Sequence, residues 1–275
     1  YLRKIAEHTI TSSGSPENWG QNQSLTPEIF GLAEDSSFGY TLDLDKVSRL
    51  NSQNAYALTY LDVLNTLRLE NVALHFSFSQ IIDVNITSDS NTTVGDTTIY
   101  TFNIYVTRNQ APVATTLNYY IVANNYLNSS SSSTASNGQG TIDVEIPNSS
   151  AGNALLIVFA CASYDSRVTA QGTYSFGHLS SEPSPNKTFL NLSPLNCTLQ
   201  VNPNVSEVSL DSAYAFSYSY EASLVSISNE TYTIPEFLDS SPQVLAVTGW
   251  NGSDYFVEWT TYPQIPLELG TNFDY

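Results

Sequence analysis

The sequence predicts a mainly β fold preceded by short helices. Its 275 residues are 41% apolar, which is enough to build a core of domain size. Apolar and polar residues alternate almost everywhere after residue 72, the pattern of half-buried antiparallel strands. The longest apolar run, Ala154–Ala162, is about half of the roughly 20 residues that span a bilayer, so it predicts a buried strand.

Helix signals occupy the first third of the chain. The first ten residues place their apolar side chains near one helical stripe, which predicts a helix there. Segment 42–50 offers an Asp cap ahead of Val47 and Leu50, and so predicts a second helix. In segment 59–67, Thr59 with Asp62 three residues later forms a capping-box pattern ahead of helically spaced leucines.

Strand signals dominate the rest of the sequence. Segment 244–259 is two apolar runs joined through Asn251–Gly252, a dipeptide that accepts the positive φ angles of a tight hairpin turn. The Ser-rich segment 128–140 has nothing to bury, so it predicts a mobile loop open to O-glycosylation. The alternating apolar faces are Leu74, Phe76, Phe78; Tyr100, Phe102, Ile104, Val106; Ile142, Val144, Ile146; and Tyr214, Phe216, Tyr218, Tyr220.

The charge balance excludes nucleic acid as a partner. Asp and Glu outnumber Lys and Arg by 26 to 8, which gives a net charge of −18 that repels phosphate backbones. Only 12% of the residues are charged, so we expect a polar but mostly neutral surface. The many Tyr residues offer sugar-stacking platforms, although Tyr is also a residue that suits half-exposed sheet faces.

Two residue classes indicate an exported protein. Sequons for N-glycosylation exceed chance modestly, which favours real glycosylation over their free generation by a Ser-, Thr- and Asn-rich composition. Cys161 and Cys197 are the only cysteines and form a predicted disulfide, with a buried core role for Cys161 as the alternative. The predicted glycosylation sites are Asn22, Asn85, Asn91, Asn128, Asn148, Asn186, Asn191, Asn196, Asn204, Asn229 and Asn251.

No metal or cofactor site is predicted. Asp43 and Asp45 are candidate Ca²⁺ ligands, but they lack EF-hand spacing and lie at a helix start, where capping is the favoured interpretation. His8, His75 and His178 are too far apart for a local metal motif, and we expect them at surface or strand positions. No glycine-rich phosphate loop opens a helix, so nucleotide cofactors are not expected.

Catalytic signals are equally weak. The sequence has no Gly-x-Ser-x-Gly elbow, although a Ser/His/Asp triad assembles only in the fold. A glycosidase needs two carboxyl groups across a cleft, and a strand acid such as Glu258 is expected to face solvent. We therefore expect a protein that is not an enzyme.

Three segments resemble the soluble part of archaeal pilin-like surface proteins. They are TSSGSPENWG (residues 11–20), FGLAEDSSFGYTLDLDKVSRLN (30–51) and LDVLNTLRLENVALHFSFS (61–79), and the C-terminal segment 244–266 is similar to the closing hairpin of that family. The resemblance implies a pilin-like sheet domain that follows an N-terminal hydrophobic helix. The matching positions are Gly14, Pro16, Trp19, Gly20, Gly31, Leu32, Ala33, Leu44, Asp45, Lys46 and Val47.

A second resemblance concerns the middle of the chain. Segments 98–125 and 137–160 are similar to an immunoglobulin-like or transthyretin-like sandwich, on the cue of Pro112 and Val113 before a Tyr-Tyr pair, then Asn-Gly and Ile-Pro. The predicted organisation is a discontinuous pilin-like β domain, residues 1–95 and 166–275, with an Ig-like β-sandwich insert at residues 96–165. The alternative is two or three β domains in series.

These observations together predict an extracellular, glycosylated structural or adhesive cell-surface protein. The resemblance implies that it is archaeal and either a filament or a surface-layer component, with self-association, other surface proteins or glycans as partners. Membrane attachment is expected only through a helix upstream of Tyr1. A secreted carbohydrate-binding module and a secreted hydrolase are the alternatives. We expect Trp19 to be a buried packing residue at the junction of helix and sheet, with Gly20 admitting the close approach.

Overall fold

The protein is mainly β, as predicted. A computed structural model describes residues 2–35, 37, 40–69, 73–228, 230–239, 241–252 and 254–270. Its helices are α1 (Leu2–Thr11), α2 (Leu44–Ser48), α3 (Tyr60–Thr66) and the 3-10 turn η1 (Asn148–Ser150). Its strands are β1 (His75–Phe78), β2 (Asp83–Val94), β3 (Thr97–Arg108), β4 (Ala111–Pro112), β5 (Thr115–Ala123), β6 (Tyr126–Ser133), β7 (Gln139–Pro147), β8 (Gly152–Ala162), β9 (Thr169–His178), β10 (Leu190–Leu195), β11 (Thr198–Pro203), β12 (Val208–Phe216), β13 (Glu221–Ser223), β14 (Val225–Ser228), β15 (Thr231–Thr233), β16 (Gln243–Asn251), β17 (Asp254–Tyr262) and β18 (Leu267–Gly270).

Strands β2 to β9 form a first sandwich. In one sheet β3 pairs with β2 on one side and with β4 and β7 on the other, and the second sheet has the order β6-β5-β8-β9. Alternate side chains of both sheets meet in one core, which includes Phe102 and Ile104 from β3 and Leu117 and Leu156 from the opposite sheet. Every pairing is antiparallel, so the period-two pattern of the sequence places one face of each outer strand in this core.

Strands β10 to β17 form a second sandwich. Its sheets have the orders β10-β11-β15-β14 and β13-β12-β16-β17. Their facing side chains, such as Leu192 and Val201 from one sheet and Ala215 and Val247 from the other, share a separate core. This second core is therefore built in the same way as the first.

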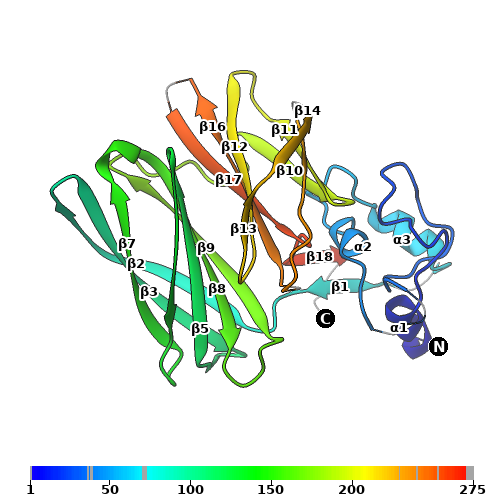
Figure 1. Cartoon of the computed structure of the whole chain (residues 1–275). Helices are drawn as coiled ribbons and strands as arrows, with labels where there is room; N and C mark the ends of the chain where they lie inside the picture. Colours follow the sequence, from blue (N-terminus) through cyan, green and yellow to red (C-terminus); the bar gives the residue numbers. More distant parts are fainter. Residues whose placement is uncertain are drawn as a thin grey trace.

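The two sandwiches pack on each other through a third apolar core. Tyr120 and Phe159 project from the sheet that contains β8, and they meet Phe216 and Val257 from the sheet that contains β16. The four sheets are thus stacked, with the two sandwiches side by side in Figure 1. Both faces of β8 are covered, which explains why Ala154–Ala162 is buried at every position and apolar without alternation.

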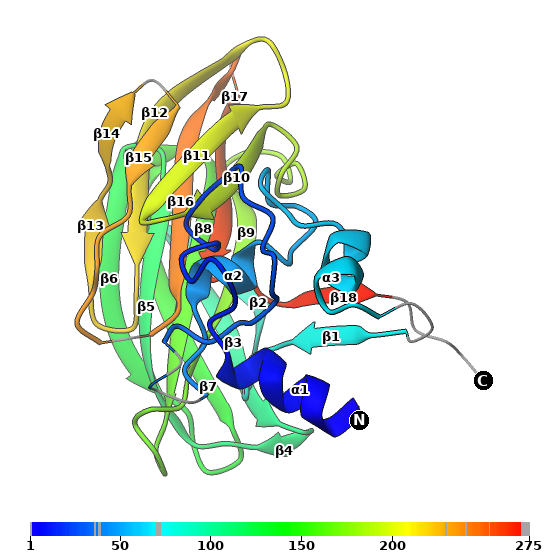
Figure 2. The same ribbon diagram turned by 90° about the vertical axis from the view of Figure 1, so that its right-hand side faces the viewer.

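The helices belong to an N-terminal unit at one end of the stack. Its core contains Trp19, Phe30, Leu50 and Val63, and β1 pairs with β18 to close it. Figure 2 shows β1 and β18 side by side beneath α3, with α1 projecting beyond them. Both sandwiches therefore lie in the sequence between two strands that are neighbours in space.

This organisation modifies the predicted domains. The inserted sandwich is wider than the predicted residues 96–165, because β2 and β9 complete its two sheets as edge strands. The flanking segments 1–95 and 166–275 do not form one sheet domain. They supply the N-terminal unit and the second sandwich, which have separate cores.

The three predicted helices are confirmed. The Asp43 carboxylate caps α2 by accepting the backbone N–H groups of Asp45 and Lys46 at 2.8 and 3.0 Å. Thr59 and Asp62 form the reciprocal capping box of α3. Helix α1 spans Leu2–Thr11. Among the described residues no helix is long and apolar enough to span a bilayer.

Three local predictions were wrong in detail. Most of the Ser-rich segment 128–140 is not a loop, because its serines continue β6, where backbone pairing with β5 supplies the order and the side chains remain largely exposed. The predicted hairpin of β16 and β17 is confirmed, but Asn251 pairs with Asp254, so its turn begins one residue later, at Gly252 with φ of 63°. Tyr218 and Tyr220 lie beyond the end of β12.

We expect the core between the sandwiches to dominate stability. Phe159 is fully buried there, and Phe159→Ala leaves a large cavity between two sheets, so it should lower the free energy of unfolding by about 3–5 kcal/mol. The measurement is urea denaturation followed by circular dichroism. Val94→Ala on β2, where the side chain is 60% exposed, is the control and should change stability by less than about 0.5 kcal/mol. Equal effects of the two substitutions would contradict a central role for this core.

Candidate functional site

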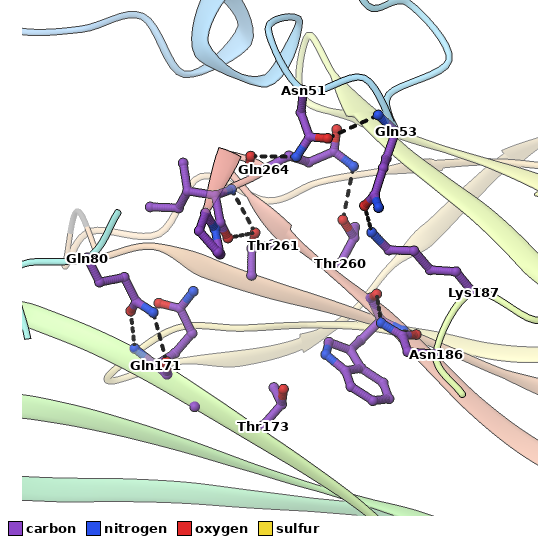
Figure 3. Close-up of a pocket in the computed structure, with 14 residues that line it drawn as sticks. Asn51, Gln53, Gln80, Gln171, Thr173, Asn186, Lys187, Thr260, Thr261 and Gln264 are labelled. Carbon is purple, nitrogen blue, oxygen red and sulfur yellow. Dashed lines mark hydrogen bonds between the residues drawn. The ribbon is translucent and has the colours of Figure 1, made fainter. Parts of the chain in front are cut away.

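A pocket of about 360 Å³ opens where the N-terminal unit and the two sandwiches meet. Its walls come from the loop after α2, the loop before β2, strand β9, the segment before β10, and strand β17 with the residues that follow it. Figure 3 shows that the labelled side chains are amides, hydroxyls and one lysine. No carboxylate lines this pocket among the residues that the structure describes.

Two amide side chains bind the edge strands on either side of the pocket. Gln80 Nε2 donates to the Gln171 carbonyl at 3.0 Å, and Gln80 Oε1 accepts the Gln171 N–H at 2.6 Å. Asn186 makes the same pair with Trp259, at 2.9 Å to the carbonyl and 3.0 Å from the N–H. Because β9 and β17 are the edges of the two central sheets, each amide takes the place of a neighbouring strand.

One wall of the pocket is held by Gln264, a residue that is 3% exposed. Its Nε2 donates to the Leu192 carbonyl at 3.0 Å and to the Thr260 hydroxyl at 3.1 Å. Its Oε1 accepts from Asn54 at 2.7 Å, and its carbonyl oxygen accepts from Asn51. The amide of Gln264 is therefore occupied by the protein and joins the N-terminal unit to the second sandwich.

Lys187 is the only cation among the residues that line the described part of this pocket. Its Nζ donates to Gln53 Oε1, which connects the segment before β10 to the loop after α2. Burial lowers the pKa of Lys187. The ammonium group is thus held at the rim by an uncharged partner.

Gln171 differs from the other buried amides of the pocket. The residue is 5% exposed, yet its Oε1 has no hydrogen-bond partner among the described residues. Figure 3 shows the side chain rising from β9 towards Thr261, across the space between the two sheets. This oxygen is enclosed by the protein, where an unpaired buried acceptor costs roughly 1–3 kcal/mol.

The polar character of the pocket follows from the alternation along β9. Ala170 and Phe176 point into the core of the first sandwich, while Gln171 and Thr173 lie on the opposite face, towards the second sandwich. On β17, Trp259 and Thr261 line the pocket from the other side. The apolar contact between the central sheets therefore becomes polar at this edge.

Trp19 and Gly20 are packing residues, as predicted. Trp19 is fully buried, its indole Nε1 donates to the Gly31 carbonyl at 3.1 Å, and the Arg49 guanidinium lies 5.6 Å from its ring centre. A Cβ on Gly20 would lie 2.6 Å from Lys46 Cγ, so glycine is required for this close approach. Both residues pack against α2 and the Arg49 that follows it. The sequence predicted instead that they fill the junction between the N-terminal helix and the sheet.

The two candidate Ca²⁺ ligands, Asp43 and Asp45, have different hydrogen-bond partners. Asp43 caps α2, whereas Asp45 Oδ1 accepts from the Tyr262 hydroxyl and from the Asn196 N–H, each at 2.8 Å. Burial raises the pKa of Asp45, and these two hydrogen bonds partly oppose that rise. A hollow of about 590 Å³ adjoins both acids, but the described residues contain no group of three or more metal-ligating side chains.

The expectation that Glu258 faces solvent was wrong. Glu258 is 2% exposed, and its two carboxylate oxygens accept the N–H groups of Phe189 and Leu190 at 2.8 and 2.7 Å. Burial raises its pKa, and the backbone hydrogen bonds oppose that rise. Glu258 shares a face of β17 with Phe256 and Tyr262, so alternation along the strand points it between the sheets of the second sandwich.

His178 is a buried strand residue. Its Nε2 lies 3.0 Å from the Pro147 carbonyl oxygen, which can only accept, so Nε2 carries the proton. Its Nδ1 then accepts from the Tyr100 hydroxyl at 3.0 Å. Burial lowers the pKa of His178, so the imidazole is neutral in the folded protein at neutral pH.

The predicted disulfide is not formed. Cys161 is a free, buried thiol on β8 of the first sandwich, and Cys197 is a free thiol in the turn between β10 and β11 of the second. The stacking of the sandwiches separates the two residues. Cys161 instead has the small core role that was the alternative.

The sequons divide by exposure. Asn22, Asn85, Asn91, Asn128, Asn196 and Asn204 are exposed. Asn148, Asn186, Asn191 and Asn251 are partly buried, and Asn229 lies outside the described residues. Six predicted sites are therefore accessible at the surface of the folded chain.

Comparisons with known proteins add little. No protein-family model and no curated protein matches this chain. Among solved structures it is similar to HBP35 of Porphyromonas gingivalis, with 14% identity and a TM-score of 0.25 over 66% of this chain. The match covers 63% of that chain, and similarity at this level carries no argument about fold or function.

We expect Asn186 to be unglycosylated although it lies in a sequon. The Asn186 Nδ2 hydrogen that bonds to the Trp259 carbonyl lies on the same side of the amide C–N bond as Oδ1. In a trans glycosyl amide the sugar carbon occupies the position of this hydrogen, so glycosylation would remove the bond to Trp259. Glycopeptide mass spectrometry of the native protein should find glycans at exposed sites such as Asn85 and Asn128, and an unmodified Asn186 peptide. A fully occupied Asn186 would contradict its pairing with β17.

We expect His178 to make stability depend on pH. The pKa of His178 in the folded protein lies below the 6.5 of the unfolded chain. Its contribution to the free energy of unfolding is therefore complete above pH 6.5 and is lost as the pH falls through the lower folded pKa. Urea denaturation should therefore show that the difference in free energy of unfolding between the native protein and His178→Asn becomes smaller from pH 7.5 to pH 5.5. His8→Asn, on the exposed face of α1, is the control and should follow the native protein. A constant difference in free energy of unfolding across this pH range would refute the assignment of His178 as a buried, neutral imidazole.

Proposed function

We propose that this protein is a non-enzymatic, glycosylated component of a cell surface, with a structural or adhesive role. The observation that carries the proposal is the exposure of two edge strands, β2 and β6. From Thr87 to Val94 on β2 and from Leu127 to Ser131 on β6, every side chain is exposed, and most are hydroxyls or amides. Accessible sequon residues Asn91 and Asn128 lie within these two runs.

The interior supports the same proposal. Three apolar cores join four sheets into one stack, so the exterior strands rest on a scaffold that is buried on both faces of its central sheets. Such a scaffold would hold a surface rich in hydroxyls, amides and glycans in a fixed shape. Its low content of exposed cations leaves few cleavage sites for proteases that cut after Lys or Arg.

The finer assignment is an archaeal pilin-like protein. The positions that carry this resemblance gather in one packed unit, because Trp19, Leu32, Lys46 and Val47 are all buried around α2. In this proposal the N-terminal unit is the pilin-like part, and an Ig-like first sandwich is displayed by it. Helix α1 projects from that unit, away from the sandwiches (Figure 2).

Self-association or binding to other surface proteins has a suitable feature in β14. This strand is the edge of its sheet, and Val225 and Ile227 on it are 70% and 61% exposed. An exposed edge with apolar side chains is the kind of surface to which another strand adds. The feature agrees with an adhesive role.

Immunogold electron microscopy on the cells that make the protein tests the proposal. Antibodies raised against the folded chain should label intact cells as strongly as permeabilised ones, because the antigen is outside. Labelling that requires permeabilisation would overturn a surface location. Filaments that carry the label would support the pilin-like assignment, whereas isolated labelled particles would refute a filament and leave the surface location intact.

A further inference from the structure

The edge strand β6 lacks the protection that the other edges of the central sheets have. The edges β9 and β17 are paired by the amides of Gln80 and Asn186, and the edge strand β13 is only 3 residues long. Strand β6, in contrast, has 8 residues that pair with β5 without a bulge. It contains no charged residue and no proline, which are the residues that commonly block edge strands.

The composition of β6 makes an unprotected edge hazardous. From Ser129 to Ser133 every side chain is the same small hydroxyl, so both faces of this run are polar. A new strand could then pair with β6 in several registers of similar energy, and strands that are polar on both faces are prone to such alternate pairing. A second copy of the chain presents the same edge, so two β6 strands can pair with each other unless the edge is covered.

An accessible sequon residue, Asn128, lies on this edge strand. Its Oδ1 accepts the Ser129 N–H at 2.9 Å, so the side chain lies along the backbone of β6. Its Nδ2 donates to the Tyr126 hydroxyl at 3.0 Å, and that hydroxyl donates to the Glu145 carbonyl of β7 at 2.9 Å. The side chain of Asn128 therefore leans towards the gap between the edges β6 and β7.

The gap between β6 and β7 leaves room for a glycan. A hollow of about 240 Å³ lies there, and its lining includes Tyr126, Asn128 and Ser130 from β6 with Asp143 and Glu145 from β7. An amide that carries a sugar on Nδ2 keeps its second Nδ2 hydrogen, so this nitrogen can still donate one hydrogen bond. A sugar attached to Asn128 would occupy the space beside the open edge of β6.

We propose that an N-glycan on Asn128 covers the edge of β6 and prevents this strand from pairing with β6 of a second copy. The glycan takes the part that the amides of Gln80 and Asn186 take at β9 and β17. The inference rests on the glycosylation in the proposed function, and it assigns a role to one particular glycan. The edge β14, which we associate with partner binding, belongs to a different sheet and stays available.

Sedimentation velocity of the native protein and of variants made in the same cells tests the proposal. Glycopeptide mass spectrometry of the native protein should first find Asn128 occupied. Asn128→Gln removes this glycan, and it should raise the association constant of the chain at least tenfold over that of the native protein. Asn204→Gln is the matched control, because it removes an exposed sequon that lies after β11 and outside β6. This control should sediment like the native protein.

A second variant, Asn128→Lys, separates the loss of the glycan from the loss of edge protection. It removes the same sequon, but it places a charge on the edge that opposes strand addition. Asn128→Lys should therefore associate no more than the native protein does. Hydrogen exchange locates the contact, because pairing through β6 should slow the exchange of backbone amides in Ser129–Ser133 when Asn128→Gln associates.

Three results would overturn the proposal. They are an unmodified Asn128 in the native protein, an Asn128→Gln variant that sediments like the native protein, and equal association of the Gln and Lys variants. Asn128 is exposed, so neither substitution removes a core contact, and circular dichroism should show the native fold in both. These results concern the β6 edge, whereas immunogold labelling reports the location of the protein, so either proposal can fail while the other stands.

Discussion

The contact between the two central sheets is the constraint on which the rest of the structure depends. Tyr120, Phe159 and Val257 bury the second face of sheets whose first faces are already covered by the outer layers. This double burial removes the alternation from β8 and aligns β9 with β17 as facing edges. On its other face β17 directs Glu258, with Phe256, into the second sandwich, where the carboxylate accepts the backbone N–H groups of Phe189 and Leu190.

The N-terminal unit is attached to this stack mainly by polar contacts. Asp45 reaches Tyr262 and Asn196 in the second sandwich, while Lys46 Nζ donates to the Ala33 carbonyl at 2.7 Å within the unit. Adjacent charges on one short helix therefore serve different partners. A buried carboxylate is costly unless it is hydrogen-bonded, so these two hydrogen bonds offset the cost of burying Asp45.

The pocket arises where these two kinds of contact meet. The apolar interface ends at the edges β9 and β17, and an edge strand leaves backbone groups unpaired unless something covers them. Gln80 and Asn186 supply that cover with side-chain amides, which also prevents another strand from adding at these residues. Protection of the edges thus produces a polar, preformed cavity in a protein that otherwise packs sheet on sheet.

Structure set by neighbouring residues could be predicted from the sequence, whereas contacts between distant segments could not. The caps at Asp43 and Thr59 act within three residues, so their patterns identified α2 and α3. The serines of β6 carry no strand signal of their own, because their order comes from backbone pairing with β5. For the pocket, alternation along β9 places Gln171 on a polar face, but nothing in the sequence pairs that face with Trp259 in another sandwich. The candidate site is therefore a consequence of the stacking, and its residues acquire a shared role only in the folded chain.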